Sequence, residues 1–265
     1  MSKGELYTII TNKKAKGKKG AIVGIFAGTK VEPIVEQLLK ISSKKRNKVK
    51  EITLDMANSM KNIAKICFQR ASQVTDRFHV QKLALEALQD IRIKHRWNAI
   101  DLENELIKLA KSKDKEYIPE IFDNGDTRKQ LLARSRYLLY KSPEKWTQNQ
   151  YLRSKILFEQ YPDIKEAFGL QQQLRNIYNK TNSIQVAYTK LAHWYKDLEK
   201  YGFKAFNTIA NTIAINYRSI LNYFINRSTN ASAESFNAKI KAFRAQFRGV
   251  RNIEFFLFRL TKIFA

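Results

Sequence analysis

Short runs of β-branched residues come first along the chain, and helical periodicity follows them. Residues 6–11 and 21–26 are rich in Ile, Val, Thr and Phe, and the link between them contains two glycines and five lysines. Two such runs joined by a polar, glycine-containing link predict an antiparallel hairpin. After Gly28, apolar residues at helical spacing up to Leu39 predict a helix.

The stretch from residue 51 to residue 80 combines both patterns. Two short runs of strand-forming residues end in Asp55 and in Asp76, and apolar residues from Met56 to Cys67 recur between them at helical spacing. The whole order is hairpin, helix, strand, helix, strand, which is the order of an RNase H-like fold that lacks its first strand. An open α/β sheet of this kind places ligand-binding groups at the carboxyl ends of its strands.

The pattern changes to a period of 3.6 residues in the middle of the chain. Six helical segments are expected there: residues 81–111, 128–140, 144–161, 163–179, 184–200 and 203–224. A polar lead-in then opens one more helix, with Ser232 or Asn230 as its cap, and Gly249 separates it from a final helix whose aromatic stripe we expect to be core. We therefore predict an α/β protein in three parts: residues 1–81 are the first part of the core, 82–226 an all-α insertion, and 227–265 the closing helices of the core.

Charge is the strongest feature of the composition. The 265 residues include 49 Lys and Arg against 24 Asp and Glu, a net charge of +25. A chain this basic is expected to bind a polyanion, and nucleic acid is the expected partner. A membrane surface and a place in the ribosome are the alternatives that charge leaves open. Its single cysteine, Cys67, excludes an internal disulfide framework and a cysteine-based zinc site, and we expect it to be packed in its helix. No apolar run is long enough to span a membrane, so we expect a cytoplasmic location.

Phosphodiester chemistry with two divalent metals needs several carboxylates that converge from separate elements. Asp55, at the end of a central strand, is placed to provide one ligand, and Glu234 on a C-terminal helix can provide another. Lys241 follows Glu234 by seven residues, so both side chains project from one face of that helix. Asn237 and Arg244 lie close to the same stripe, where they can bind a DNA phosphate.

Each of these acids also has a structural explanation. Asp55 can cap the helix that follows it. Glu234 can be a surface acid that complements the dipole of its helix. Asp76 and His79 can be a cap and a buried histidine. Spacing alone leaves these alternatives open.

Three segments carry a family resemblance: LDMANSM, VTDRFHVQKLALEAL and TNASAESFNAKIKAF. Together they resemble the DDE transposases of the ISL-three insertion-sequence group over nearly the whole chain. The resemblance implies an RNase H-like core interrupted by a helical insertion. It also implies Mg²⁺- or Mn²⁺-dependent cleavage and joining of DNA at terminal inverted repeats and at a target site, by a homo-oligomer, in a bacterial, nucleoid-associated setting.

By this resemblance Asp55 matches the second catalytic acid and Glu234 the third, and these two are the expected metal ligands. Asp76 and His79 resemble a supporting pair, with Asp76 as the alternative second acid. The residues expected to contact DNA are Arg77, Asn237, Lys241 and Arg244.

The chain departs from the family pattern at its start. In the family the first catalytic Asp precedes the KG-x-x-Y segment by a few residues, whereas here Lys3 to Tyr7 follow Met1-Ser2 directly. We therefore expect the C-terminal catalytic portion of a transposase, with little strand transfer unless a separately encoded N-terminal segment supplies the first acid. The alternatives are a non-catalytic DNA-binding remnant and a metal-dependent nuclease.

Overall fold

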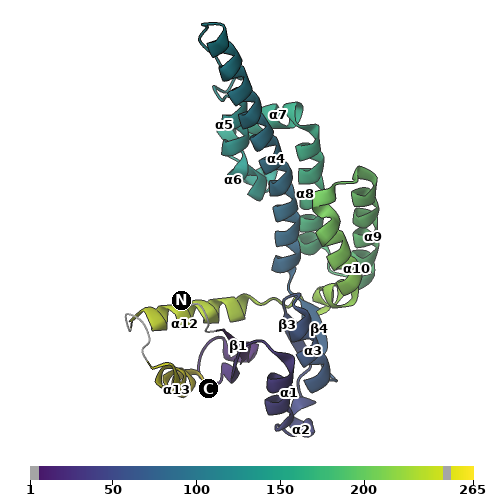
Figure 1. The fold of residues 1–265 in the computed structure, drawn as a ribbon. Coiled ribbons are helices and arrows are strands. Elements are labelled where there is room, and N and C mark those ends of the chain that lie inside the picture. The colour runs from purple at the N-terminus through teal and green to yellow at the C-terminus, as the bar shows by residue number, and fades with distance from the viewer. Residues whose placement is uncertain (1–5, 247–251) are drawn as a thin grey trace. The chain divides into compact units, whose positions relative to one another are not determined.

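The computed structural model describes residues 6–246 and 252–265 and divides the chain into two compact units. Met1–Arg77 together with Arg218–Ala265 make up one of them, called the first unit below. Phe78–Tyr217 make up the other, called the helical unit. Figure 1 shows strands in the first unit only, among the described residues.

The expected hairpin opens the first unit. Strand β1 (Tyr7–Thr11) pairs antiparallel with β2 (Ile22–Ala27), and a short 3₁₀ helix η1 (Lys13–Ala15) lies in the connection. Gly17 in that connection has a φ of 69°, the left-handed conformation that glycine adopts without strain. The helix expected next is α1 (Val31–Leu39).

Two parallel strands follow. The basic segment before them contains a short helix α2 (Ser43–Arg46). Strand β3 (Glu51–Leu54) pairs with β4 (Ser72–Thr75) in a register that places Leu54 opposite Thr75, and α3 (Asn58–Cys67) connects the two strands. The strand–helix–strand order predicted from the sequence is therefore confirmed.

Hydrogen bonds join the described strands into two separate pairs, β1 with β2 and β3 with β4. The continuous sheet of an RNase H-like core is not formed by these residues. The two pairs share a helical layer instead: α1 packs against α3, whose Ile63 and the buried Cys67 form a core with Ile34 of α1. Phe26 of the hairpin packs against the same core. The architecture is therefore α/β in this unit, with two short sheets.

The C-terminal helices form a second core with the other face of the hairpin. Phe236 of α12 (Ala231–Gln246) and Leu260 of α13 (Ile253–Phe264) are buried together with Ala21 and Ile22. The aromatic stripe of the last helix is only partly core, because Phe255 and Phe258 are each 54% exposed. The break expected at Gly249 lies outside the described residues.

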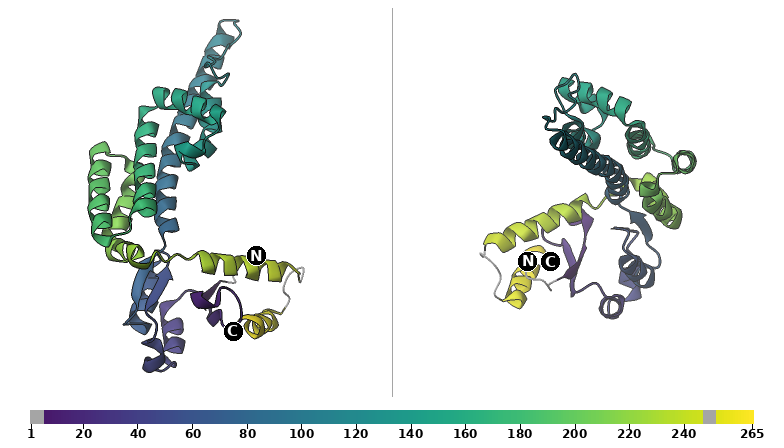
Figure 2. Two further views of the ribbon diagram at one scale, coloured as in Figure 1. Left: turned by 180° about the vertical axis from the view of Figure 1, so that it is seen from behind. Right: turned by 45° about the horizontal axis from the view of Figure 1, so that its top comes forward.

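The helical unit is built on α4, which begins in the first unit. Its helices and their bounds are α4 (Arg77–Ser112), α5 (Arg128–Arg134), α6 (Arg136–Tyr140), α7 (Gln148–Gln160), α8 (Pro162–Lys180), α9 (Ile184–Tyr201) and α10 (Asn207–Leu221), with 3₁₀ turns η2 (Pro143–Lys145) and η3 (Lys204–Phe206). The last turn of α10 and the short helix α11 (Tyr223–Asn226) belong to the first unit. Helix α8 packs against both α7 and α9 (Figure 2). Large side chains such as Leu174 and Trp194 are fully buried. None of the helices in the described part of the chain is both long and apolar enough to cross a membrane.

A buried carboxylate holds the loop before α5 in place. The Asp126 side chain is completely buried and accepts hydrogen bonds from Arg134, from Asn124 and, at 2.7 Å, from Arg153 of α7. Burial alone would raise the pKa of Asp126, but the hydrogen bonds and charges of Arg153 and Arg134 outweigh it and lower the pKa below its ordinary 3.8. The two arginines allow the Asp126 carboxylate to stay charged in the interior. Burying that charge without a partner would cost several kcal/mol of folding free energy.

Candidate active site at the ends of β3 and β4

The parallel register brings two aspartates to one edge of a sheet. Leu54 pairs with Thr75 as the last residues of their strands, and Asp55 and Asp76 come directly after them. The Asp76 backbone N–H donates to the Leu54 carbonyl at 3.1 Å, which extends the ladder by one bond. Both carboxylates therefore start from the carboxyl end of the β3–β4 pair, where open α/β sheets bind their ligands.

Asp55 is partly exposed and has local partners. One of its carboxylate oxygens accepts a hydrogen bond from the Ala57 backbone N–H at 2.9 Å, just before α3. The charge of Asp55 also interacts with Lys61 in α3. Burial lowers the pKa of Lys61, and the Asp55 carboxylate partly opposes that shift. Asp55 therefore bonds to the backbone just before α3, but the N-cap position of that helix is occupied by Ala57.

Asp76 is the more deeply placed of the two. Its side chain is 1% exposed, and one carboxylate oxygen accepts a hydrogen bond from the Asn230 backbone N–H at 3.0 Å. Asn230 is the residue before α12, and its carbonyl accepts from the Glu234 N–H at 2.9 Å, so it is the cap that the sequence offered as one of two choices. Asp76 thus connects the end of β4 to the start of α12, 154 residues later in the chain.

The same connection gathers three groups that can bind a metal. Ligand atoms of Asp76, His79 and Glu234 all lie within 4.8 Å of one another. His79 is in the first turn of α4, one turn from Asp76, and Glu234 is exposed in the first turn of α12. Two carboxylates and an imidazole suit a divalent cation: oxygen ligands are those of Mg²⁺, and an imidazole nitrogen also suits Mn²⁺.

Two arginines, Arg77 and Arg227, contact the same buried side chain, Tyr223. Arg77 donates to the Tyr223 hydroxyl at 3.1 Å, and its guanidinium carbon lies 5.9 Å from the centre of the Tyr223 ring. The guanidinium of Arg227 lies 5.7 Å from the same ring. Arg227 has a φ of 52°, an uncommon left-handed conformation for a residue with a side chain. Sequence reasoning found Arg77 but missed Arg227 and Tyr223; the arginine at the start of the polar lead-in to α12 was the available signal.

The exposed face of α12 carries the residues expected to contact DNA. Glu234, Asn237 and Lys241 are all exposed, while Phe236 is buried on the other side of the helix. Arg244 is partly exposed one turn further on. The helix is continuous from Ala231 to Gln246, so the seven-residue spacing of Glu234 and Lys241 places both on one face, as the sequence indicated.

A basic turn lies beside this helix. The connection between β1 and β2 contains five lysines, and Lys239 of α12 donates to the Gly17 carbonyl of that connection at 3.4 Å. Lys13 from the same connection donates to the Thr53 hydroxyl of β3 at 3.1 Å. The hairpin connection therefore brings lysines next to β3 and α12, the elements that lead to Asp55 and Glu234.

Comparison with known proteins identifies the family. The model of a family described as Transposase, the DDE transposases of the ISL-three group (DDE_Tnp_ISL3), matches residues 1–260. No curated protein and no solved structure matches the chain. The family match covers almost the whole sequence, including LDM, DRFHV and the segment around Glu234, so this chain belongs to the ISL-three group of DDE transposases.

Proposed function

We propose that this transposase chain cleaves and joins DNA at insertion-sequence ends with Mg²⁺ or Mn²⁺ bound where β3, β4 and α12 meet. The observation that carries the proposal is the convergence of Asp76, His79 and Glu234 within 4.8 Å. Asp76 and His79 are neighbours in the sequence, whereas Glu234 comes from α12, far along the chain. Asp76 lies at a strand end, where the α/β architecture places ligands. Asp55 lies at the same edge, one residue beyond the last β3–β4 pair.

In this site Asp55 and Glu234 are the proposed metal ligands, and Asp76 with His79 forms the supporting pair. Bound divalent metals would activate the attacking hydroxyl and stabilise the leaving oxygen of the phosphodiester. Asp76 holds the start of α12 through Asn230, which fixes Glu234 relative to the strands. The alternative, with Asp76 as the second acid, is favoured by its place in the three-residue group and its near-complete burial.

The basic residues around the site are proposed to hold the DNA. Arg77 beside the carboxylates, and Asn237, Lys241 and Arg244 along α12, can contact phosphates on either side of the scissile bond. Charge-assisted contacts of this kind position the backbone without reading its sequence. The partners proposed are therefore the terminal inverted repeats and the target DNA.

A further strand can complete the sheet. Among the described strands, β1 bonds only to β2 and β3 only to β4, so each leaves one edge unpaired. Unpaired strand edges accept another strand. We propose that a separately encoded transposase segment pairs there and supplies a third carboxylate, and that the chain alone joins DNA poorly.

The test is an assay with DNA that carries the element's inverted repeat, in the presence of Mg²⁺, Mn²⁺ or EDTA, with and without the added N-terminal segment. We expect metal-dependent cleavage and joining that the added segment increases. Asp55→Ala and Asp76→Ala are compared with Asp123→Ala, an exposed aspartate of the helical unit. The true second acid is the one whose loss removes activity without weakening DNA binding.

Two other outcomes would replace the proposal. DNA binding without metal-dependent cleavage under every condition would identify a non-catalytic DNA-binding protein. Metal-dependent cleavage with no joining and no preference for the inverted repeat would identify a nuclease. Equal activity of wild type, Asp55→Ala and Asp76→Ala would remove both aspartates from the site.

A further inference from the structure

The distal part of α4 exposes a regular stripe of leucines. Leu102, Leu106 and Leu109 are 49%, 41% and 51% exposed, although each is large and apolar. Together with Ala99 they follow one another at intervals of three, four and three residues. This is the spacing at which one helix packs along another. In Figures 1 and 2 this end of α4 extends past the other helices of its unit.

A cavity opens beside the stripe. It has a volume of about 280 Å³, and its lining includes Ala99, Leu102 and Leu106 on one side and Ile118 on the other. Ile118, in the segment that returns from α4, is 81% exposed. A cavity of this size has room for aliphatic side chains of a partner but not for a whole helix, which is about 10 Å across. A partner helix would therefore lie over the cavity and insert side chains into it.

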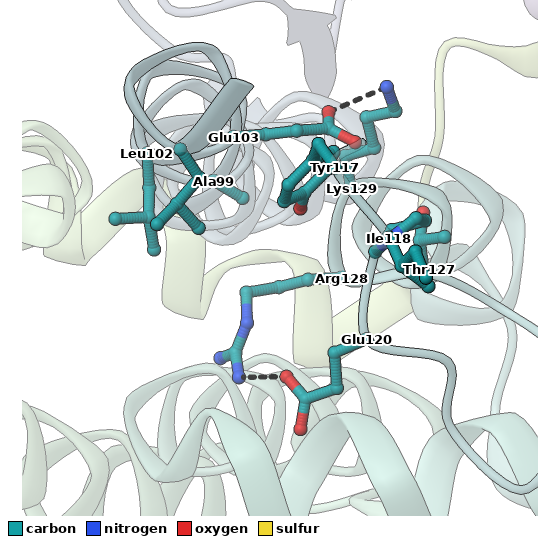
Figure 3. Close-up of a pocket in the computed structure, with 11 residues that line it drawn as sticks. Ala99, Leu102, Glu103, Tyr117, Ile118, Glu120, Thr127, Arg128 and Lys129 are labelled. Atoms are coloured by element: carbon teal, nitrogen blue, oxygen red, sulfur yellow. Dashed lines mark hydrogen bonds and ion pairs between the residues drawn. The ribbon is translucent and has the colours of Figure 1, made fainter. Parts of the chain in front are cut away.

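Two ion pairs fix the walls of this cavity. Glu103 of α4 pairs with Lys129 at 2.6 Å, and Glu120 of the returning segment pairs with Arg128 at 3.1 Å. Figure 3 shows both pairs at the edge of the cavity, with Leu102 and Ala99 on the α4 side. The two ion pairs therefore tie α4 and the returning segment to the start of α5, on either side of the apolar surface.

The charge of this region differs from that of the rest of the chain. Residues 99–129 contain eight acidic and six basic residues, a net charge of −2, in a chain of net charge +25. The remaining residues therefore carry +27. A surface of this kind does not attract DNA, whose binding depends on positive charge. It is also a place where two copies of a very basic chain can meet with little repulsion.

The charges along the helix are ordered as well. Asp101, Glu103 and Glu105 precede Leu106 in α4, and Lys108 and Lys111 follow it. Antiparallel pairing of two such helices places the acidic half of one beside the basic half of the other. Parallel pairing places like charges together. The stripe is therefore self-complementary about a two-fold axis, as the interface of a symmetric dimer requires.

We propose that residues 99–112 of α4 form a dimerisation surface, on which the same segment of a second copy packs antiparallel through the leucine stripe. This inference concerns the helical unit and does not depend on the catalytic role proposed for the first unit.

The first test is sedimentation equilibrium of the full chain at 0.15 M salt, where charges further apart than about 8 Å are screened. Wild type is expected to dimerise, and Leu106→Glu to weaken dimerisation at least tenfold. The control is Leu152→Glu on α7, the same change at a side chain that is 45% exposed, which should leave it unchanged. Circular dichroism melting checks that both variants fold, which is expected because both leucines are exposed.

The second test uses charge reversal. Asp101→Lys/Glu105→Lys leaves Glu103 as the one acidic residue among residues 99–112, and Lys108→Glu/Lys111→Glu makes all the charges of that segment acidic. Each variant alone should dimerise at least several-fold more weakly than wild type, and an equimolar mixture should recover association as a heterodimer. A wild-type chain that stays monomeric, equal weakening by Leu106→Glu and Leu152→Glu, or a mixture that does not recover would overturn the proposal.

Discussion

The first unit and the helical unit differ most in their charge. The first unit contains 26 basic and 8 acidic residues, a net charge of +18, whereas the larger helical unit contains 23 basic and 16 acidic residues, a net charge of +7. DNA affinity depends on the number of phosphates that basic side chains neutralise. On this basis we expect most of the DNA binding in the unit that also contains the candidate active site.

The hydrophobic core is larger in the helical unit than in the first unit, the reverse of the order for net charge. The described part of the first unit has two modest cores, one under α1 and α3 and one under α12 and α13, and two sheets of two strands each. Two-stranded sheets have little stability of their own. The helical unit buries a long series of leucines and aromatic residues, including Leu131, Leu138 and Trp194. The proposed catalytic residues and the larger hydrophobic core thus lie mainly in different units. We therefore expect mutations to affect activity and stability separately.

The largest effect is expected at Glu234. Glu234→Ala should lower the rate of metal-dependent DNA cleavage by a factor on the order of 10³, since losing a metal ligand removes several kcal/mol of transition-state stabilisation. Glu254→Ala is the matched control, because Glu254 is also an exposed acid in the first turn of a C-terminal helix. Single-turnover cleavage rates compare the two. Equal rates would mean that Glu234 is only a surface acid.

Asp126→Ala should destabilise the helical unit by about 3 kcal/mol, because it leaves Arg153 without the partner for which it is partly buried. DNA affinity should change little, since most of the excess positive charge lies in the first unit. Differential scanning calorimetry and a DNA-binding titration measure the two effects. A loss of DNA binding while the helical unit stays folded would contradict the division between the units.

The same carboxylate gives a pH dependence. The pKa of Asp126 is lower in the folded chain than its ordinary 3.8. A depressed carboxyl pKa contributes stability that is present above the ordinary value and is lost as the pH falls through the folded value. The helical unit of wild type should therefore lose stability as the pH falls below about 4, whereas Asp126→Ala should lose less over the same range. Thermal melts at a series of pH values provide the measurement.

A smaller effect is expected at His79. His79→Ala should reduce cleavage by about 10- to 100-fold, the range found when a group that supports a metal site is lost. His79→Gln, which keeps a polar group at the same place, should recover part of the rate. If Mn²⁺ affinity and cleavage were both unchanged in His79→Ala, the histidine would be structural.

The smallest effect is expected from single basic residues of α12. Lys241→Ala should weaken binding to all DNA sequences alike and reduce the slope of log affinity against log salt by about 1. Lys204→Ala, at an exposed lysine of the helical unit, should leave the slope unchanged. Fluorescence anisotropy over a range of salt concentrations tests both. Equal slopes for the two variants would place the DNA elsewhere.

Local order was well predicted from the sequence. The hairpin, the strand–helix–strand segment around Asp55 and Asp76, and most helices follow from periodicity and turn residues, because these patterns act over short distances. Helix boundaries were less accurate: the segment expected at 144–161 begins as a helix at Gln148, since Thr147 and Gln150 form a capping box there. The basic stretch before β3 includes a helical turn that its charge did not suggest.

Tertiary contacts were harder to predict. The sequence offered Asp55, Asp76 and Glu234 as separate candidates, but the hydrogen bond from Asn230 to Asp76 joins segments 154 residues apart, which no local pattern reports. Arg227 was missed because its left-handed conformation depends on the end of α11. The exposure of Phe255 and Phe258 was missed because periodicity marks an apolar face without showing what covers it.

The most direct test of the account is to locate the bound metal without relying on activity. Fe²⁺ replaces Mg²⁺ in the full chain, ascorbate and peroxide are added, and mass spectrometry maps the backbone cuts made by locally generated radicals. The account predicts cuts beside Asp55, Asp76–His79 and Asn230–Glu234, which excess Mg²⁺ suppresses and Glu234→Ala removes. Cuts confined to other segments, or cuts unaffected by Glu234→Ala, would contradict a metal site where β3, β4 and α12 meet.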